Sequence, residues 1–283
     1  MKKIAIVSDS TGCISNNILE DLNIFVNHLV IIFKEDSYQE FKDIGPEEFV
    51  KLCSQQEELP TTSQPAPGQT VELYEKILAK GYDEIIHLAV SSQLSGSYQS
   101  AANCADMVNP EKITVIDTKT VAYPQGMIAV EAAKMAQSGA TKEEILNKIE
   151  ALKKECHLSA AIYNLTNLKK GGRLSNTQAT IGSLLGIKPI VQIQPDGTLE
   201  PVEKIRTFKK ALNGLIERTK SANLTEDYEI GILHMANPEG AETLREEVAK
   251  AYPNLKVQIL PLSLVISVHA GEGAVAIGWI KTK

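Results

Sequence analysis

The sequence contains few aromatic residues and few cysteines. Phe, Trp and Tyr make up 5% of the 283 residues, with a single Trp. A chain so poor in aromatic rings is not typical of proteins that stack nucleic-acid bases or sugars on them. The four cysteines, at positions 13, 53, 104 and 156, are far apart and form no CxxC pair. This spacing excludes a zinc ribbon, a redox dithiol and a dense disulfide framework.

A long uninterrupted apolar segment is also missing. Near the N-terminus, Ser8 and Asp9 interrupt an apolar stretch that is too short for a secretory signal. The most apolar region, residues 260–280, contains His269 and Glu272 and does not fit a membrane span. The net charge of −6 disfavours nucleic acid as a partner. We therefore expect a cytoplasmic protein with no stable membrane insertion and no nucleic-acid partner.

The composition is that of an ordinary globular protein, with 43% hydrophobic and 23% charged residues. A chain of 283 residues is long enough for one large or two ordinary domains. In the first half, short β-branched runs alternate with helical patterns. The expected strands are 4–7, 25–33, 84–90 and 113–117, and the main expected helices begin near 46, 71, 126 and 141. This alternation predicts βαβ units and a largely parallel sheet.

The second half follows a different pattern. Residues 188–194 and 199–205 are predicted strands, and the turn sequence PDGT joins them at 195–198. Such a hairpin requires antiparallel pairing. We therefore predict an α/β protein of two domains. Residues 1–157 form a largely parallel sheet with flanking helices, and residues 158–283 form a mixed sheet with helices.

Two segments rich in hydroxyl groups are candidates for a binding site. PTTSQPAPG at 60–68 includes Thr61 and Thr62, and SSQLSGS at 91–97 includes Ser92 and Ser95. Each segment precedes a predicted helix, where backbone N–H groups are available to a ligand. Each segment taken alone is also explained by turns and helix caps. Two such segments at consecutive strand ends favour a ligand site at the carboxyl edge of the sheet.

Three further segments carry cations or a histidine beside glycines. LKKGGRLS at 168–175 contains Arg173, KIRTFKK at 204–210 contains Arg206, and VHAGEG at 268–273 contains His269. A solvated loop or helix start is the usual explanation of each basic segment taken alone, although a basic patch on an acidic protein suits an acidic or phosphorylated partner. The chain has neither a P-loop nor a GxSxG motif, and Asp9 after the first strand is most simply a helix cap.

In their order along the chain, these segments resemble the DegV family, whose members include the FakB fatty-acid-binding proteins. The resembling segments are SDST at 8–11, PTTSQP at 60–65, SSQLSG at 91–96, KKGGRLS at 169–175, RTFKK at 206–210 and HAGEG at 269–273. The resemblance covers nearly the whole chain. It implies a DegV-like fold of two α/β domains with a long-chain fatty acid, similar to hexadecanoate, bound between them.

The resemblance also implies roles for individual residues. The hydroxyls of Thr61, Thr62, Ser92 and Ser95 are expected to hold the fatty acid carboxylate, with His269 nearby. Arg173 and Arg206 match basic positions near the head group or the kinase-docking face. The protein is then a carrier that performs no chemistry itself, needs no cofactor or metal, and presents the acyl chain to an ATP-dependent fatty acid kinase.

Two other hypotheses remain open from the sequence. One is a phosphoryl or acyl transferase that acts on a bound lipid through Asp9, Arg173 and His269. The other is a regulatory protein that keeps the fold with an idle pocket. The absence of a nucleotide or metal motif, and of paired acidic residues near the site, argues against the transferase.

Overall fold

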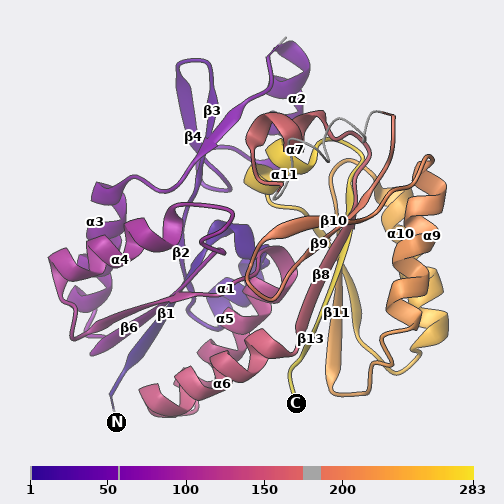
Figure 1. Cartoon of the computed structure of the whole chain (residues 1–283). Helices are drawn as coiled ribbons and strands as arrows, with labels where there is room; N and C mark the ends of the chain where they lie inside the picture. The colour runs from indigo at the N-terminus through magenta and orange to yellow at the C-terminus, as the bar shows by residue number, and fades with distance from the viewer. Residues whose placement is uncertain (1, 57, 175–185) are drawn as a thin grey trace. The chain divides into compact units, whose positions relative to one another are not determined.

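Internal packing divides the chain into two units. The computed structural model describes residues 2–56, 58–174 and 186–283 (Figure 1). The N-terminal unit comprises Met1–Lys154 and Ser263–Val265, and the C-terminal unit comprises Glu155–Leu262 and Ile266–Lys283. The chain thus returns to the N-terminal unit for three residues, which the sequence does not indicate.

A four-stranded sheet forms the centre of the N-terminal unit. Its strands, in spatial order, are β2 (Phe25–Asn27), β1 (Ile4–Asp9), β6 (Glu84–Ala89) and β7 (Ile113–Asp117). All three pairings are parallel. Every residue of β1 and β6 is buried, as expected for central parallel strands covered on both faces. The predicted parallel sheet is confirmed.

Helices cover both faces of this sheet (Figure 1). The helices of the unit are η1 (Ser10–Gly12), α1 (Asn16–Asp21), α2 (Pro46–Gln55), α3 (Pro67–Ala79), α4 (Ser97–Val108), α5 (Ala122–Gln137) and α6 (Lys142–Lys154). Tyr74 of α3 and Cys104 of α4 pack with Val7 in one apolar core. The helix expected to begin near 141 is α6, and it starts with a capping box: the Thr141 N–H donates to Glu144 (2.8 Å) and the Glu144 N–H donates to the Thr141 hydroxyl (3.3 Å).

A second, three-stranded antiparallel sheet in this unit was not expected. Its spatial order is β4 (Asp36–Gln39), β3 (Val30–Phe33) and β5 (Thr61–Ser63). The single strand predicted over 25–33 is therefore wrong, because the chain leaves the parallel sheet after Asn27. The Leu29 N–H donates to the Ser10 hydroxyl (3.0 Å) at this point, which fixes the break between β2 and β3.

The C-terminal unit contains a six-stranded mixed sheet, as predicted. Its strands, in spatial order, are β10 (Leu199–Glu203), β9 (Ile190–Ile193), β8 (Cys156–Ala161), β13 (Val275–Lys281), β11 (Tyr228–His234) and β12 (Val257–Pro261). Only β11 and β12 pair in parallel among these strands. The predicted hairpin joins β9 to β10, and Gly197 adopts a φ of +93° in its turn.

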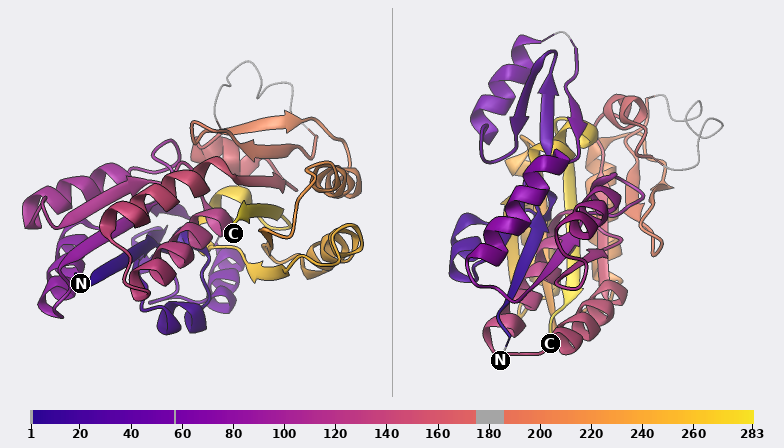
Figure 2. Two further views of the ribbon diagram at one scale, coloured as in Figure 1. Left: turned by 90° about the horizontal axis from the view of Figure 1, so that it is seen from below. Right: turned by 90° about the vertical axis from the view of Figure 1, so that its left-hand side faces the viewer.

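Two long helices, α9 (Phe208–Lys220) and α10 (Pro238–Ala251), lie side by side on one face of this sheet (Figures 1 and 2). Thr207 caps α9 by accepting a hydrogen bond from the Lys210 N–H (3.4 Å). Two shorter helices are α7 (Thr166–Gly171) and α11 (Leu264–Ala270). Within the described ranges, no helix is both long and apolar enough to cross a bilayer.

Candidate functional site

The threonines at 61 and 62 lie on a strand rather than on a loop after a parallel strand. They belong to β5, where Thr62 pairs directly with Ile31 of β3. Ile31 is fully buried, and directly paired residues of an antiparallel sheet share a face. Thr62 therefore lies on the buried face of the small sheet, whereas Thr61 is exposed on the other face. Strand alternation thus separates the two hydroxyls.

The second hydroxyl-rich segment follows β6 at the carboxyl edge of the parallel sheet, as predicted. It adjoins the end of β5 through Gly96. A Cβ atom added to Gly96 would lie 2.2 Å from Oε1 of Gln64, so the Gln64 amide occupies the space that a side chain at position 96 would need. The structure therefore brings the two hydroxyl-rich segments together within the N-terminal unit.

The two serines proposed from the sequence have different surroundings. The Ser95 hydroxyl accepts from the Ser97 N–H (3.2 Å) and lies 2.9 Å from the Ser97 hydroxyl. When the Ser97 hydroxyl is the donor, the proton of Ser95 is available to a ligand. The Ser92 hydroxyl instead donates to Asp117 Oδ2 (2.6 Å), and its N–H donates to Oδ1 (3.2 Å). A negative charge beside Ser92 disfavours a bound carboxylate there.

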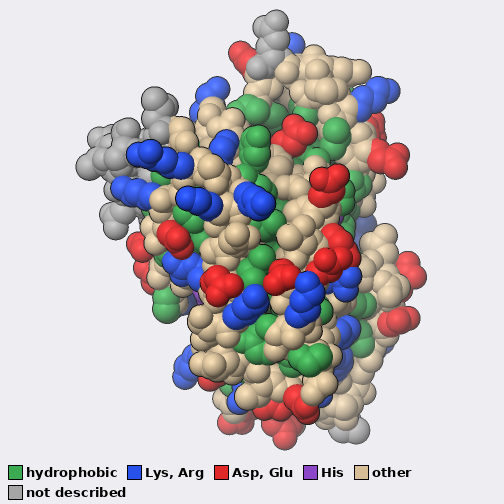
Figure 3. Space-filling view, turned by 90° about the vertical axis from the view of Figure 1, so that its right-hand side faces the viewer, with side chains coloured by type: hydrophobic (Ala, Val, Ile, Leu, Met, Phe, Trp, Pro, Cys, Tyr) green, Lys and Arg blue, Asp and Glu red, His purple; other side chains and the backbone are tan. Residues whose placement is uncertain are grey.

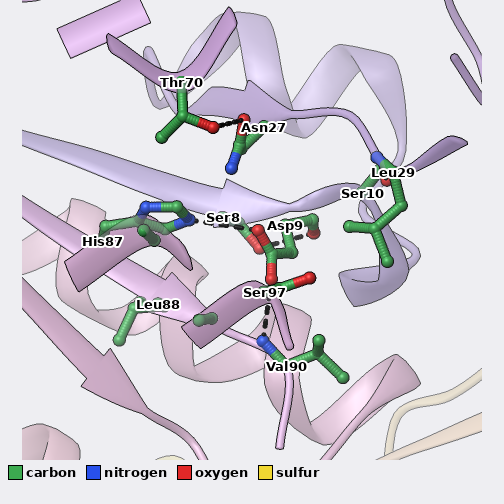
Figure 4. Close-up of polar contacts among 12 residues, drawn as sticks. Ser8, Asp9, Ser10, Asn27, Leu29, Thr70, His87, Leu88, Val90 and Ser97 are labelled. Carbon is green, nitrogen blue, oxygen red and sulfur yellow. Dashed lines mark hydrogen bonds and ion pairs between the residues drawn. The ribbon is translucent and has the colours of Figure 1, made fainter. Parts of the chain in front are cut away.

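A buried polar network supports the start of residues 91–97 (Figure 4). The Asp9 carboxylate accepts from the Val90 N–H (2.9 Å) and from His87 Nε2 (3.1 Å). The other ring nitrogen, Nδ1, lies 2.6 Å from the Tyr74 hydroxyl. Asp9 is 1% exposed and makes no helix cap, so the capping interpretation is wrong.

A second buried carboxylate, Glu40, fixes the returning segment Ser263–Val265. Its Oε1 accepts from the Ser10 hydroxyl (2.5 Å), and its Oε2 accepts from the Ser263 hydroxyl (2.7 Å) and the Val265 N–H (3.1 Å). Burial raises the pKa of Glu40, and the hydrogen bonds from Ser10 and Ser263 oppose that rise. Helix α11 begins at this anchor.

In the C-terminal unit, His269 and the predicted glycine-rich basic segment come together. His269 lies in the last turn of α11 and packs on Gly171, the last residue of α7. The Arg173 guanidinium donates to the Gly171 carbonyl. Burial, and then the positive charge of Arg173, lower the pKa of His269 to about 4, so its imidazole is neutral at pH 7. Ser175 of this segment lies outside the described residues.

Arg206 lies apart from this group of side chains, in the connection between β10 and α9. It is exposed and, among the residues that the structure describes, makes no hydrogen bond or ion pair. Lys204, Lys209 and Lys210 beside it in the sequence are exposed as well. Figure 3 shows Lys and Arg side chains gathered on one part of the face it displays. Arg206 therefore takes no part in the internal packing of the described residues.

Comparison with known proteins identifies the family. The family model described as uncharacterised protein, DegV family, matches residues 3–282. The chain belongs to the DegV family. The protein DegV of Bacillus subtilis is 36% identical over 278 residues, which cover 98% of each chain.

Solved DegV structures share the fold. A fatty acid binding DegV family protein from Streptococcus agalactiae superposes with a TM-score of 0.91 at 30% identity, covering 99% of each chain. DegV from Bacillus subtilis, a fatty acid binding protein, superposes with a TM-score of 0.89 at 35% identity, covering 99% of this chain and all of its own. The parallel N-terminal and mixed C-terminal sheets are therefore the DegV fold.

Some residues of the candidate site gave little signal in the sequence. Glu40 lies between Gln39 and Phe41, and its partner Ser263 is 223 positions away. His87 sits fully buried within β6, and its place in the sequence does not reveal its bond to Asp9. Gln64 lies inside the hydroxyl-rich segment 60–68. Its amide occupies space that is open only because Gly96 has no side chain.

Proposed function

We propose that this protein binds a long-chain fatty acid and presents it to the catalytic subunit of an ATP-dependent fatty acid kinase, which forms the acyl-phosphate. The observation that carries the proposal is the convergence of two hydroxyl-rich segments at Gln64 and Gly96, in a chain that matches fatty acid binding DegV proteins along its whole length. The protein acts as a carrier, and the chemistry belongs to the kinase.

Thr62 and Ser95 hold the carboxylate in this proposal, with His269 as a further polar contact. Burial of an acyl chain contributes about 0.8 kcal/mol per CH₂, so ~15 methylenes supply roughly 12 kcal/mol before the costs of association. The head group therefore needs only hydrogen bonds rather than a paired cation. Ser92, which donates to Asp117, and Thr61, which lies on the exposed face of β5, are left out of this clamp.

Thr62→Val and Ser95→Ala are each expected to weaken fatty acid binding about ten- to a hundredfold. A hydrogen bond to a charged group contributes about 1.5–3 kcal/mol, and ~1.4 kcal/mol corresponds to a tenfold change. Thr61→Val is the matched control, because it makes the same change on the opposite face of the strand. The measurement is a fatty acid titration of delipidated protein, preceded by mass spectrometry of the lipid released from purified protein.

A fatty alcohol of equal chain length tests the same clamp from the ligand side. Wild type is expected to bind the acid more tightly than the alcohol, and the two variants should reduce this preference. Equal binding of acid and alcohol by wild type would exclude the clamp. A purified protein that carries no lipid and shows no response to any fatty acid would exclude the carrier function itself.

Arg206→Ala is expected to retain the bound lipid and to lose acyl-phosphate formation in an assay reconstituted with the kinase. The reason is that Arg206 is exposed and unpaired among the described residues, so its charge is available to an acidic surface of the partner. Arg245→Ala, which removes an arginine already paired with Glu242, is the matched control. Loss of lipid from the Arg206 variant would instead make this residue part of the ligand site.

A further inference from the structure

The imidazole of His269 packs so closely on α7 that only a glycine fits beneath it. A Cβ atom added to Gly171 would lie 2.3 Å from Nδ1 and 3.0 Å from Cε1 of His269. Gly171 is not among the glycines with positive φ, so its backbone conformation is open to other residues. The requirement for glycine at this position therefore comes from the neighbouring ring and not from the backbone.

Other contacts hold the end of α11 against α7. The Asn167 amide donates to the Val268 carbonyl (2.9 Å), one residue before His269. Gly271, with a φ of +79°, ends the helix and donates its N–H to Ser267 (2.9 Å). The backbone on both sides of His269 is thus fixed, and the ring has little freedom to move away from Gly171.

This packing sets the orientation of the imidazole. Nδ1 is buried against α7. Because the two ring nitrogens point to different sides of an imidazole, Nε2 is turned away from Gly171. The Arg173 guanidinium, bonded to the Gly171 carbonyl, adds a positive charge close to the ring. Gly171 therefore contributes twice, once through its missing side chain and once through its carbonyl.

We propose that Gly171 is a positioning residue, which seats the Nδ1 edge of His269 so that Nε2 is the nitrogen that contacts the fatty acid head group. This inference rests on the proposed function and names a residue on which that function depends. Gly171 itself does not touch the ligand. Its effect on binding passes through the orientation of His269.

Gly171→Ala is expected to weaken fatty acid binding about tenfold, a change of ~1.4 kcal/mol. In lipid-free protein, the NMR titration of His269 should show its pKa rising from about 4 towards the ordinary value of about 6.5, because the displaced ring leaves its buried position beside Arg173. Gly45→Ala is the matched control, since a Cβ at this residue before α2 meets nothing within 4 Å and the residue lies outside the proposed site. It should change neither quantity.

The double variant separates positioning from a general effect on folding. In a His269→Ala background, Gly171→Ala should cause no further loss of affinity, because the ring that it displaces is absent. An equal loss in both backgrounds, with an unchanged pKa of His269 in the single variant, would overturn the inference. If the pKa of His269 shifts in Gly171→Ala but wild type binds no fatty acid, the result supports the positioning of the imidazole by Gly171 and contradicts the proposed function.

Discussion

Replacement of Asp9 by alanine is expected to lower the free energy of unfolding by about 3–5 kcal/mol. The substitution leaves two buried donors, the Val90 N–H and His87 Nε2, without their acceptor. Val90 directly precedes the hydroxyl-rich segment 91–97. Fatty acid binding should therefore weaken along with stability. Urea denaturation followed by circular dichroism measures the first effect, and lipid titration measures the second.

Asp117→Ala is the appropriate control for this prediction. Asp117 also accepts backbone N–H groups at a loop, from Ser92 and Lys119, but these bonds are exposed to water. Its loss should cost about 1 kcal/mol or less. In addition, His87→Leu in the Asp9→Ala background should recover part of the stability, because it removes one stranded donor. If Asp9→Ala and Asp117→Ala cost the same, the buried network contributes no more than an exposed contact.

Gly126→Ala is expected to cost about 3 kcal/mol, near the upper end of the usual range for overpacked cores. A Cβ at this position of α5 would lie 2.1 Å from the carbonyl oxygen of Gly12 and 3.0 Å from Cγ1 of Ile14. A backbone oxygen cannot rotate away as a side chain can, so α5 must move relative to η1. Without this clash, alanine inside a helix would stabilise it by about 1 kcal/mol relative to glycine.

The same denaturation experiment tests this second prediction. Gly45→Ala serves as its control, because a Cβ at this residue before α2 meets nothing within 4 Å. The control should unfold at nearly the wild-type urea concentration, and Gly126→Ala at a markedly lower one. A Gly126 variant as stable as the control would show that the helix can shift at little cost.

Sequence patterns predicted those parts of the fold that local chemistry determines. The short β-branched runs of β1 and β6 indicated parallel strands, and the turn around Gly197 indicated the hairpin. Thr141 and Glu144 predicted the start of α6 because a capping box depends only on a spacing of three residues. In each case the physical cause lies within a few residues along the chain.

Features that depend on distant partners were missed or misplaced. Residues 25–33 were expected to form one strand, and the break after Asn27 is fixed by Ser10, which lies in another part of the sequence. The prolines around Thr62 suggested a loop, whereas pairing with Ile31 makes the segment a strand. Ser92 and Ser95 look equivalent in the sequence. In the structure the Ser92 hydroxyl donates to Asp117, which is 25 positions away. Composition and spacing carry no information on such pairings.

The anchoring of Ser263–Val265 at Glu40 also bears on how the protein forms on the ribosome. Residue 154 completes the contiguous part of the N-terminal unit, and 109 further residues (263 − 154) must be synthesised before Ser263 emerges. At ~5–20 residues per second, this interval lasts roughly 5–20 s. During that time the Glu40 carboxylate lacks two of its three hydrogen-bond donors named above. The nascent N-terminal unit thus remains unfinished until the C-terminal unit is almost fully translated.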